Sequence, residues 1–442
     1  MPNPPPAVTA TSPALQALIA RGYYDHASDL EAIDRALSAG PVTFYIGFDP
    51  TAPSLHVGSL LQIMAMRLLQ KHGHRPIALL GSGTALIGDP SGKSEMRKLI
   101  TRDEIRQNAL GIKEHFLRLV QMESGAANDA ILVDNADWLC GLHYLEFLRD
   151  IGRHFTVNRM VAVKTYRDRL DAEIPLSFLE FNYQLLQAYD FLHLFRAHGC
   201  TLQLGGSDQW GNIVAGVELI RRVTCEDETS GAAFALTLPL ITTPDGKKMG
   251  KTERGAVWLA ADRLSPFDYF QFWVSTDDRE TGKLLRLYTD LPLDEIQALT
   301  EVEGSALRAA KTRLAYEATR LLHGEEAAET ALKASRQAFG GGEDWSAVPL
   351  VTVATGAIKL VDLVVHPEIE AFKSKREARQ RIEGGAVKLN GDVVTDPSAM
   401  LEPGDEPVRL QSGKKTRLRV VIAAGDGVVS SSGDGSSAGE AS

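Results

Sequence analysis

The stretch Tyr45–Ser59, with the sequence Y-I-G-F-D-P-T-A-P-S-L-H-V-G-S, decides how the first half of the chain is expected to fold. It follows a β-branched and aromatic run and precedes an apolar run of helical period, which predicts a strand that turns into a helix. His56 and Ser59 then fall in the first helical turn, where free N–H groups and the helix dipole favour phosphate. Gly47 and Gly58 would let a ligand lie close against the main chain. The stretch therefore predicts a nucleotide pocket, with a ligand-free strand, turn and helix as the alternative.

The segment Gly47–Gly58, here termed the first motif, resembles the first signature of class I aminoacyl-tRNA synthetases. Its wording, G-F-D-P-T-A-x-S-L-H-V-G, is similar to that of bacterial members of the tyrosyl branch of this family. Ser59 replaces the last histidine of the signature, and a hydroxyl can form a hydrogen bond but cannot carry an imidazolium charge. The resemblance implies ATP-binding residues at Gly47, Asp49, Thr51, His56, Gly58, Ser59, Gly205, Asp208, Lys248 and Lys251.

Composition and length are typical of a globular protein. The 442 residues predict two to three domains, and 44% of the residues are hydrophobic. No apolar run approaches the roughly 20 residues of a membrane helix and no signal peptide is recognisable, so we expect a cytoplasmic protein without membrane contact. Cys140, Cys200 and Cys225 indicate neither a disulfide framework nor a C-x-x-C pair. The net charge of -10 argues against indiscriminate nucleic-acid binding, so RNA is expected on a local patch.

The pattern from Ala14 to Ala39 predicts a helix that ends at Gly40-Pro41, before the first strand. A second buried strand at residues 76–80 follows the next helix, and this alternation predicts a doubly wound α/β sheet. Asp89 comes after this strand, toward the edge of the sheet where α/β proteins bind ligands. The resemblance implies that Asp89 contacts the ammonium group of an amino acid. The alternative is a turn aspartate before Pro90, which is a common structural use.

The stretch Phe178–Phe191 predicts one wall of a substrate pocket. Tyr183, Gln187 and Asp190 stand at i, i+4 and i+7, so a helix presents all three along one face. For a lone helical tyrosine, core packing is the alternative. The resemblance places Tyr183 and Gln187 at the amino end of a bound tyrosine, and Tyr45 and Asp190 at its phenol. The full set of tyrosine-binding residues that it implies is Tyr45, Asp89, Tyr183, Gln187, Asp190 and Gln209.

Residues 202–212 repeat the order of strand, glycine turn and helix. Their glycines leave room for ribose and adenine, and Asp208 suits a ribose diol. The run G-G-S-D-Q-W-G-N is similar to the tyrosyl and tryptophanyl branches, and in the tyrosyl branch the position of Gln209 lies near the substrate. By itself G-G-S-D is only a turn.

The segment Lys248–Thr252, here termed the second motif, resembles the K-M-S-K-S signature of class I synthetases. Gly250 and Thr252 replace its two serines. Ammonium groups in this glycine-rich loop would stabilise charge that develops on the triphosphate in the transition state. An exposed turn is the alternative. The catalytic residues implied by both motifs are His56, Lys248, Lys251 and Thr252.

The C-terminal part of the chain predicts RNA contact. The hairpin at residues 386–394, with Asn-Gly at its turn, follows two predicted helices at 357–365 and 374–381 and resembles the S4 RNA-binding domain. Residues 371–422 hold 11 Lys and Arg against 7 Asp and Glu, an excess of +4 in a chain of net charge -10. RNA phosphate is the natural partner of such a patch, and a merely solvated face is the alternative. The candidate tRNA-binding residues are Lys375, Arg376, Arg379, Lys414, Lys415 and Arg417.

The fold class expected is α/β: a Rossmann-like doubly wound parallel sheet with an insertion, then an α-helical domain and a C-terminal S4-like RNA-binding domain. The insertion, within residues 101–170, is implied by resemblance to support a homodimer. The expected parts are a disordered leader (1–13), a catalytic domain (14–255), a helical domain that contacts the anticodon arm (256–338), a linker (339–352), the S4-like domain (353–423) and a disordered tail (424–442).

The function implied by the resemblance is that of a ligase which activates L-tyrosine with ATP and transfers it to tRNA(Tyr). Mg²⁺ would arrive with ATP, because no cluster of His, Cys or carboxylate residues has the spacing of a protein-bound metal site. Two alternatives remain open. One is a tryptophan-specific relative, against which Tyr45 and Asp190 argue because an indole offers only a donor. The other is a catalytically silent RNA-binding protein, against which the presence of both motifs argues.

Overall fold

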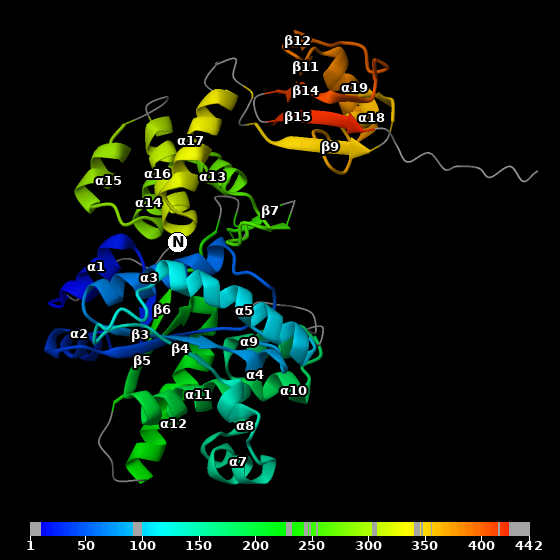
Figure 1. Cartoon of the computed structure of the whole chain (residues 1–442). Helices are drawn as coiled ribbons and strands as arrows, with labels where there is room; N and C mark the ends of the chain where they lie inside the picture. The colour runs from blue at the N-terminus through cyan, green and yellow to red at the C-terminus, as the bar shows by residue number, and fades with distance from the viewer. Residues whose placement is uncertain are drawn as a thin grey trace, which may run out of the picture. The chain divides into compact units, whose positions relative to one another are not determined.

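The computed structural model describes residues 10–91, 100–226, 232–242, 246, 249–252, 255–302, 307–339, 345, 348–354, 356–413 and 416–423. The chain forms two compact units, Met1–Glu329 and Thr330–Ser442 (Figure 1). Of the leader expected at 1–13, residues 1–9 lie outside the described residues, but Ser12 is buried and caps α1, which begins at Pro13. Of the linker expected at 339–352, residues 340–344 and 346–347 lie outside the described residues, but Phe339 ends α17 and Leu350 begins β9. The tail expected at 424–442 lies outside the described residues.

A six-stranded sheet of order β1-β6-β5-β2-β3-β4 forms the centre of the first unit. Strand β1 pairs antiparallel with β6, and the other neighbours pair in parallel. The predicted doubly wound α/β fold with a parallel sheet is therefore confirmed. The strands are β1 (His26–Ala27), β2 (Thr43–Phe48), β3 (Arg75–Leu80), β4 (Ile131–Asp134), β5 (Cys200–Gly206) and β6 (Phe234–Leu238).

The antiparallel edge strand corrects one prediction. The apolar pattern predicts a single helix over 14–39, but the structure has α1 (Pro13–Arg21) and α2 (Leu30–Ala39) with β1 between them. Gly22 ends α1 in the left-handed conformation (φ 88°), and Asp29 caps α2. A glycine cap of this kind ends a helix although the apolar period continues.

Helices cover both faces of the sheet. Figure 1 shows α3 and α5 on one face and α11 and α12 on the other. The first motif leads from β2 through residues 49–56 into α3, so the predicted order of strand, turn and helix is confirmed. The sequence predicts His56 and Ser59 in the first helical turn; Ser59 lies there, and His56 is the N-cap that precedes it. The helices of this part are α3 (Val57–Lys71), α4 (Ser82–Ala85), α5 (Arg102–Leu119), α6 (Ala136–Leu139), α7 (Tyr144–Asp150), η1 (Gly152–His154), α8 (Val157–Val161), α9 (Lys164–Asp171), α10 (Phe178–Phe181), α11 (Tyr183–His198), η2 (Ser207–Gln209) and α12 (Trp210–Glu226).

The predicted helical region follows a small hairpin of β7 (Lys251–Thr252) and β8 (Gly255–Ala256). Its core contains Tyr269, Trp273 and Tyr288, all fully buried. Within the part of the chain that the structure describes, no helix has both the length and the apolar character needed to cross a membrane. The helices here are α13 (Pro266–Val274), η3 (Asp278–Glu280), α14 (Thr281–Tyr288), α15 (Leu293–Thr300), α16 (Leu307–His323) and α17 (Glu325–Phe339).

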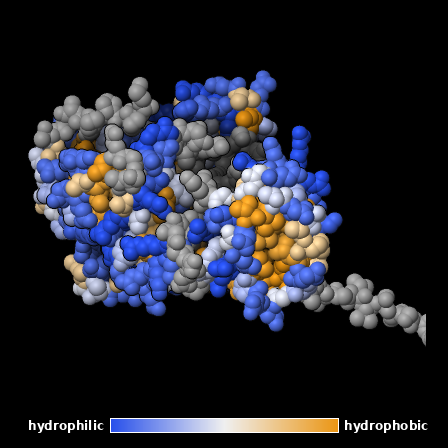
Figure 2. Space-filling view, turned by 90° about the horizontal axis from the view of Figure 1, so that it is seen from above, coloured by the Kyte–Doolittle hydropathy of each residue, from blue (hydrophilic) through white to orange (hydrophobic). Residues whose placement is uncertain are grey.

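The second unit contains a five-stranded sheet of order β12-β11-β14-β15-β9. Asn390 (φ 52°) and Gly391 (φ 103°) form the predicted hairpin turn. The helix predicted over 357–365 is wrong, because its first residues pair as β10 and only one helical turn, α18, remains. Figure 2 shows an apolar area bordered by polar residues on this unit, the right-hand lobe. Its elements are β9 (Leu350–Ala354), β10 (Ile358–Lys359), α18 (Leu360–Leu363), α19 (Lys375–Glu383), β11 (Val387–Leu389), β12 (Asp392–Val393), β13 (Met400–Leu401), β14 (Gly404–Ser412) and β15 (Thr416–Ala423).

Candidate active site

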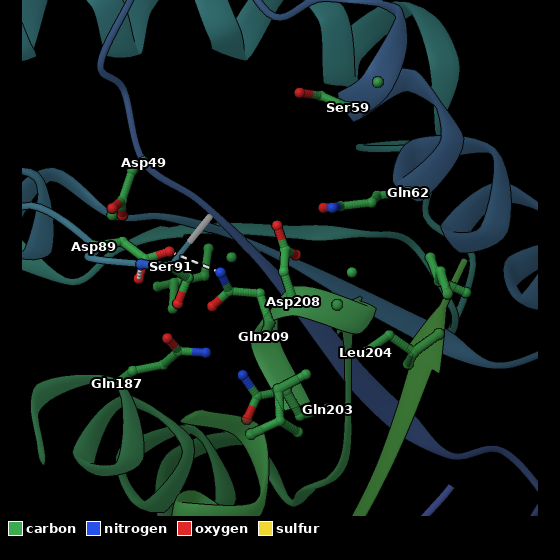
Figure 3. Close-up of a pocket in the computed structure, with 18 of the residues that line it drawn as sticks. Asp49, Ser59, Gln62, Asp89, Ser91, Gln187, Gln203, Leu204, Asp208 and Gln209 are labelled. Carbon is green, nitrogen blue, oxygen red and sulfur yellow. Dashed lines mark hydrogen bonds between the residues drawn. The ribbon is translucent and has the colours of Figure 1, made fainter. Parts of the chain in front are cut away.

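A pocket of about 360 Å³ opens at the carboxyl ends of the parallel strands β2, β3 and β5, where α/β folds bind ligands. Helices α3 and α11 and the segment 238–241 after β6 supply further walls. Figure 3 shows Ser59 and Gln62 of α3 facing Asp208 across the pocket, with Gln187 of α11 below.

The structure brings together nearly all the residues that the sequence predicts for ATP and tyrosine. Those lining the pocket are Tyr45, Gly47, Asp49, Thr51, His56, Gly58, Ser59, Asp89, Tyr183, Gln187, Asp190, Gly205, Asp208 and Gln209. Lys248 lies outside the described residues. Lys251 and Thr252 form strand β7, of which only the main chain is described.

Helix α11 presents the predicted row of polar side chains to the pocket. The Tyr183 hydroxyl donates to Asp49 Oδ2 at 2.9 Å, so α11 is tied to the first motif. Burial and the nearby carboxylates of Asp49 and Asp89 raise the pKa of Tyr183, so this phenol stays protonated. Among the described residues, the buried Tyr45 hydroxyl and Gln187 Oε1 have no hydrogen-bond partner. Buried polar atoms without a partner inside a cavity are favourable positions for a polar ligand.

Asp190 lies at the closed end of the pocket with 2% of its surface exposed. Its carboxylate accepts hydrogen bonds from Asn135 Nδ2 (2.9 Å) and Trp138 Nε1 (2.8 Å). Burial raises the pKa of Asp190 to about 8, and the two hydrogen bonds oppose this shift. No sequence pattern points to Asn135 or Trp138, because neither belongs to a motif and their contact with Asp190 depends on how β4 and α6 pack against α11.

Asp89 is joined to the segment after β5. Gln209 Nε2 donates to Asp89 Oδ2 at 2.7 Å, the dashed line in Figure 3, and the main-chain N–H of Ser91 donates to Oδ1 at 2.9 Å. The sequence suggested that Asp89 comes just past the end of β3. In the structure the short helix α4 lies between β3 and Asp89. Asp89 nevertheless reaches the pocket beside Gln209.

Two glycines at the end of β5 line the pocket. An ideal Cβ at Gly206 would lie 2.7 Å from Asp208 Oδ1, and one at Gly205 would lie 2.9 Å from Ile213 Cδ1. Both distances are too short for any other residue without rearrangement. The adjacent wall is apolar and consists of Ile213, Leu238, Pro239, Leu240, Ile241 and Met249. A cavity with one polar and one apolar wall suits a ribose and a flat base.

The two motifs lie side by side although some 190 residues separate them. The ideal Cβ position of Gly250 is 3.4 Å from Gly58 N and 3.9 Å from His56 Nδ1. The N–H of Val257 donates to the Gly250 carbonyl (2.8 Å), and the N–H of Val57 donates to the Val257 carbonyl (3.0 Å). The main chain that carries Lys251 therefore passes next to the start of α3.

The candidate tRNA-binding residues belong to the second unit. Lys375, Arg376 and Arg379 are exposed on α19, and Lys375 pairs with Asp362 at 2.7 Å. Arg417 on β15 lies over the Trp345 ring, with Cζ 5.6 Å from the ring centre. Lys414 and Lys415 lie outside the described residues. In the described segments no group of three or more His, Cys, Asp or Glu side chains is arranged to hold a metal ion.

The sheet and pocket define a nucleotide-binding protein of the class I synthetase type, and comparison with known families supports this. Residues 37–340 match the family described as tRNA synthetases class I (W and Y), and residues 368–407 match the S4 domain. The chain belongs to this family of class I tRNA synthetases.

Bacterial relatives at about 50% identity are named Tyrosine–tRNA ligase. The Tyrosine–tRNA ligase of Zymomonas mobilis is 51% identical over 91% of this chain and 96% of its own length. That of Caulobacter vibrioides is 48% identical over the same shares. A C-terminally truncated mitochondrial tyrosyl-tRNA synthetase of Aspergillus nidulans is 30% identical, with a TM-score of 0.66 over 74% of this chain and 94% of that one. A tryptophanyl-tRNA synthetase of Aeropyrum pernix, 17% identical with a TM-score of 0.54, shares the fold alone.

Proposed function

We propose that the chain is a tyrosine–tRNA ligase. It activates L-tyrosine with ATP to tyrosyl-AMP and pyrophosphate, and then transfers the tyrosyl group to the 3′ end of tRNA(Tyr). The observation that carries this proposal is one pocket that joins a buried polar end, with Tyr45 and Asp190, to a glycine-lined end beside the first motif. Membership of the family and relatives at about 50% identity support it.

The choice of amino acid follows from the buried polar end. A bound phenol can donate to the Asp190 carboxylate and accept from the Tyr45 hydroxyl, which has no described partner. Phenylalanine would leave the Tyr45 hydroxyl buried and unpaired and would offer nothing polar to Asp190, which would keep only its bonds to Asn135 and Trp138. An indole would supply only a donor. At the other end of the amino acid we assign Asp89, Tyr183, Gln187 and Gln209 to the ammonium and carboxylate groups. All four line the pocket, and Gln209 is hydrogen-bonded to Asp89, which supports this assignment.

The activation step needs positioning and charge stabilisation rather than covalent help from the protein. The tyrosine carboxylate attacks the α-phosphorus of ATP in line, its oxygen forms the new bond, and pyrophosphate leaves. We assign the ribose and phosphates to the predicted ATP-binding residues, and stabilisation of the transition state to His56, Lys248, Lys251 and Thr252. The contact of Gly250 with the start of α3 supports this, because it brings the second motif to the first. Mg²⁺ would enter with the triphosphate, whose oxygens it prefers as ligands.

The second unit and the insertion are proposed to serve tRNA and assembly. The S4 match and the exposed cations of α19 support tRNA binding by the second unit. We further propose a homodimer in the cytoplasm. Exposed large apolar side chains within residues 144–179, which include two residues beyond the insertion expected at 101–170, support a subunit contact. Val157, Leu170 and Phe178 among them line one mainly apolar groove, and apolar groups that gather on a surface mark interfaces. The exposed side chains are Tyr144, Leu145, Val157, Leu170, Phe178 and Leu179.

Amino-acid-dependent exchange of labelled pyrophosphate into ATP tests the proposal. Tyrosine should support exchange, whereas phenylalanine and tryptophan should not. The variant Asp190→Ala should lose discrimination against phenylalanine, since the buried carboxylate that demands a donor is gone. Exchange driven by tryptophan would favour the tryptophanyl branch, and no exchange with any amino acid would favour a silent RNA-binding protein.

A further inference from the structure

One helix supports the first motif from behind. Asn108 Nδ2 on α5 donates to the carbonyl of Pro50 at 3.0 Å. One turn further on, the ideal Cβ position of Gly111 lies only 2.2 Å from the carbonyl oxygen of Pro53. Any side chain at position 111 would push the turn away, so the main chain of α5 lies directly against it. These contacts lie on one face of the helix, which is continued by position 115.

At position 115 the same face of α5 contacts Ser54, whose hydroxyl takes part in three hydrogen bonds, here termed the junction. His115 Nε2 lies 3.1 Å from the hydroxyl of Ser54, and both side chains are buried. This hydroxyl also accepts from the N–H of Ala260 (3.1 Å) and donates to the carbonyl of Leu55 (2.8 Å). Because a hydroxyl has a single hydrogen, the bond to Leu55 requires His115 to donate its Nε2–H to Ser54.

The junction ends a short antiparallel pairing between residues 55–57 of the first motif and residues 257–259, which follow the second motif. The N–H of Val57 donates to the Val257 carbonyl (3.0 Å), and the N–H of Leu259 donates to the Leu55 carbonyl (2.9 Å). The bond from Ala260 to Ser54 adds one rung. Ser54 therefore fixes the first motif to the chain that follows the second motif, and His115 fixes Ser54.

Neither Ser54 nor His115 lines the pocket, so neither can touch substrate there. Burial lowers the pKa of His115 to about 4, assisted by the positive charge of Arg118 and opposed by Asp262. The imidazole is thus neutral near pH 7 and contributes a hydrogen bond rather than a charge.

We propose that His115, acting through Ser54, is a positioning residue for tyrosyl-adenylate formation: it holds the turn with Asp49, Thr51 and His56 in register with the segment after the second motif. This inference rests on the proposed function. A small displacement of that turn would move groups at the nucleotide while leaving the tyrosine end of the pocket unchanged, so the loss should fall on the chemical step.

The test uses the full chain and counts active sites by the burst of tyrosyl-adenylate before exchange rates are measured. His115→Leu should lower the exchange rate per titrated site about tenfold while KM for tyrosine changes less than about twofold. His115→Gln, whose amide can still donate to Ser54, should recover most of the rate. Ser54→Ala should show the same loss as His115→Leu, and the double variant should be no slower than either single one.

His74→Leu is the matched control. His74 is also buried and accepts from the N–H of Val42 at 3.2 Å, but it precedes β3 at the opposite end of the strands. Its loss should change stability and leave the rate per titrated site near the wild-type value. Unchanged rates in His115→Leu and Ser54→Ala, or additive losses in the double variant, would overturn the proposal. If His115→Leu does not fold, Ser54→Ala decides alone. A wild-type chain without exchange would refute the proposed function instead.

Discussion

Single buried residues determine what the pocket accepts, and Asp190 carries the clearest energetic consequence. Its unfolded-state pKa is the ordinary 3.8, whereas burial raises the folded-state pKa to about 8. Between about pH 3.8 and pH 8, the Asp190 carboxyl of the folded, ligand-free chain therefore retains a proton that it has lost in the unfolded chain. Stability linked to this proton is complete below about pH 3.8 and is lost as the pH rises toward about 8.

Replacing Asp190 by Asn should remove the loss of folding stability that accompanies a rise in pH. In thermal denaturation without ligands from about pH 5 to about pH 8.5, the melting temperature of the variant minus that of the wild type should increase as the pH rises. This difference should become constant above about pH 8. Asn135 and Trp138 both donate to position 190, so an Asn there can shift the whole curve by a constant amount. The slope of the difference is the informative quantity, and parallel curves would contradict the prediction.

At the scale of an element, the second motif depends on one glycine conformation. Gly250 has φ 88°, a left-handed conformation that costs other residues about 1 kcal/mol or more. The resemblance would place serine at this position. The structure favours glycine, because the strained conformation brings the main chain against Gly58 and His56.

Gly250→Ser should therefore slow tyrosine-dependent exchange. A cost of roughly 1 kcal/mol for the left-handed conformation, in which position 250 contacts Gly58 and His56, corresponds to about a fivefold lower rate. Gly250→Ala should give an equal loss, and Gly250→Asn a smaller one, because asparagine tolerates the left-handed region better. Presteady-state measurement of adenylate formation separates this effect from tyrosine binding. Faster exchange by the serine variant would show that the hydroxyl matters more than the main-chain conformation.

For the whole molecule, the division into two units predicts separable activities. A chain ending at Phe339 keeps α17 entire and removes the rest of the second unit, including the five-stranded sheet and the basic segment 371–422. It should retain tyrosine-dependent pyrophosphate exchange within about twofold, but charge tRNA poorly and with a shallower dependence on salt, because fewer phosphates are neutralised. Charging at the full-length rate would remove the case for RNA binding by the second unit.

The proposed homodimer predicts a mass of twice the 48.0 kDa of one chain in light scattering. Phe178→Glu should shift the protein toward monomer, since a charge would be buried in an apolar contact. Leu350→Glu is the control, because Leu350 is also an exposed apolar residue (52%, against 69% for Phe178) but lies in the second unit. A dimer that survives Phe178→Glu would exclude this surface as the subunit contact.

The sequence by itself determined the parallel sheet, the positions of both motifs and the polar row on α11. The sheet and the polar row depend on local rules of apolar period, glycine turns and helical spacing, and the motifs were identified by their resemblance to the class I signatures. Local rules failed at residues 14–39 and 357–365. At 14–39 the apolar period continues past Gly22, which ends the helix. At 357–365 it continues through residues that pair as a strand.

Only the tertiary structure decided which residues complete the site. Asn135 and Trp138 reach Asp190 from 55 and 52 positions away in the chain, and His115 reaches Ser54 from 61. Such contacts follow from how strands and helices pack, and no spacing in the sequence encodes them. The raised pKa of Asp190 has the same origin, because burial is a property of the packed sheet and helices rather than of the aspartate.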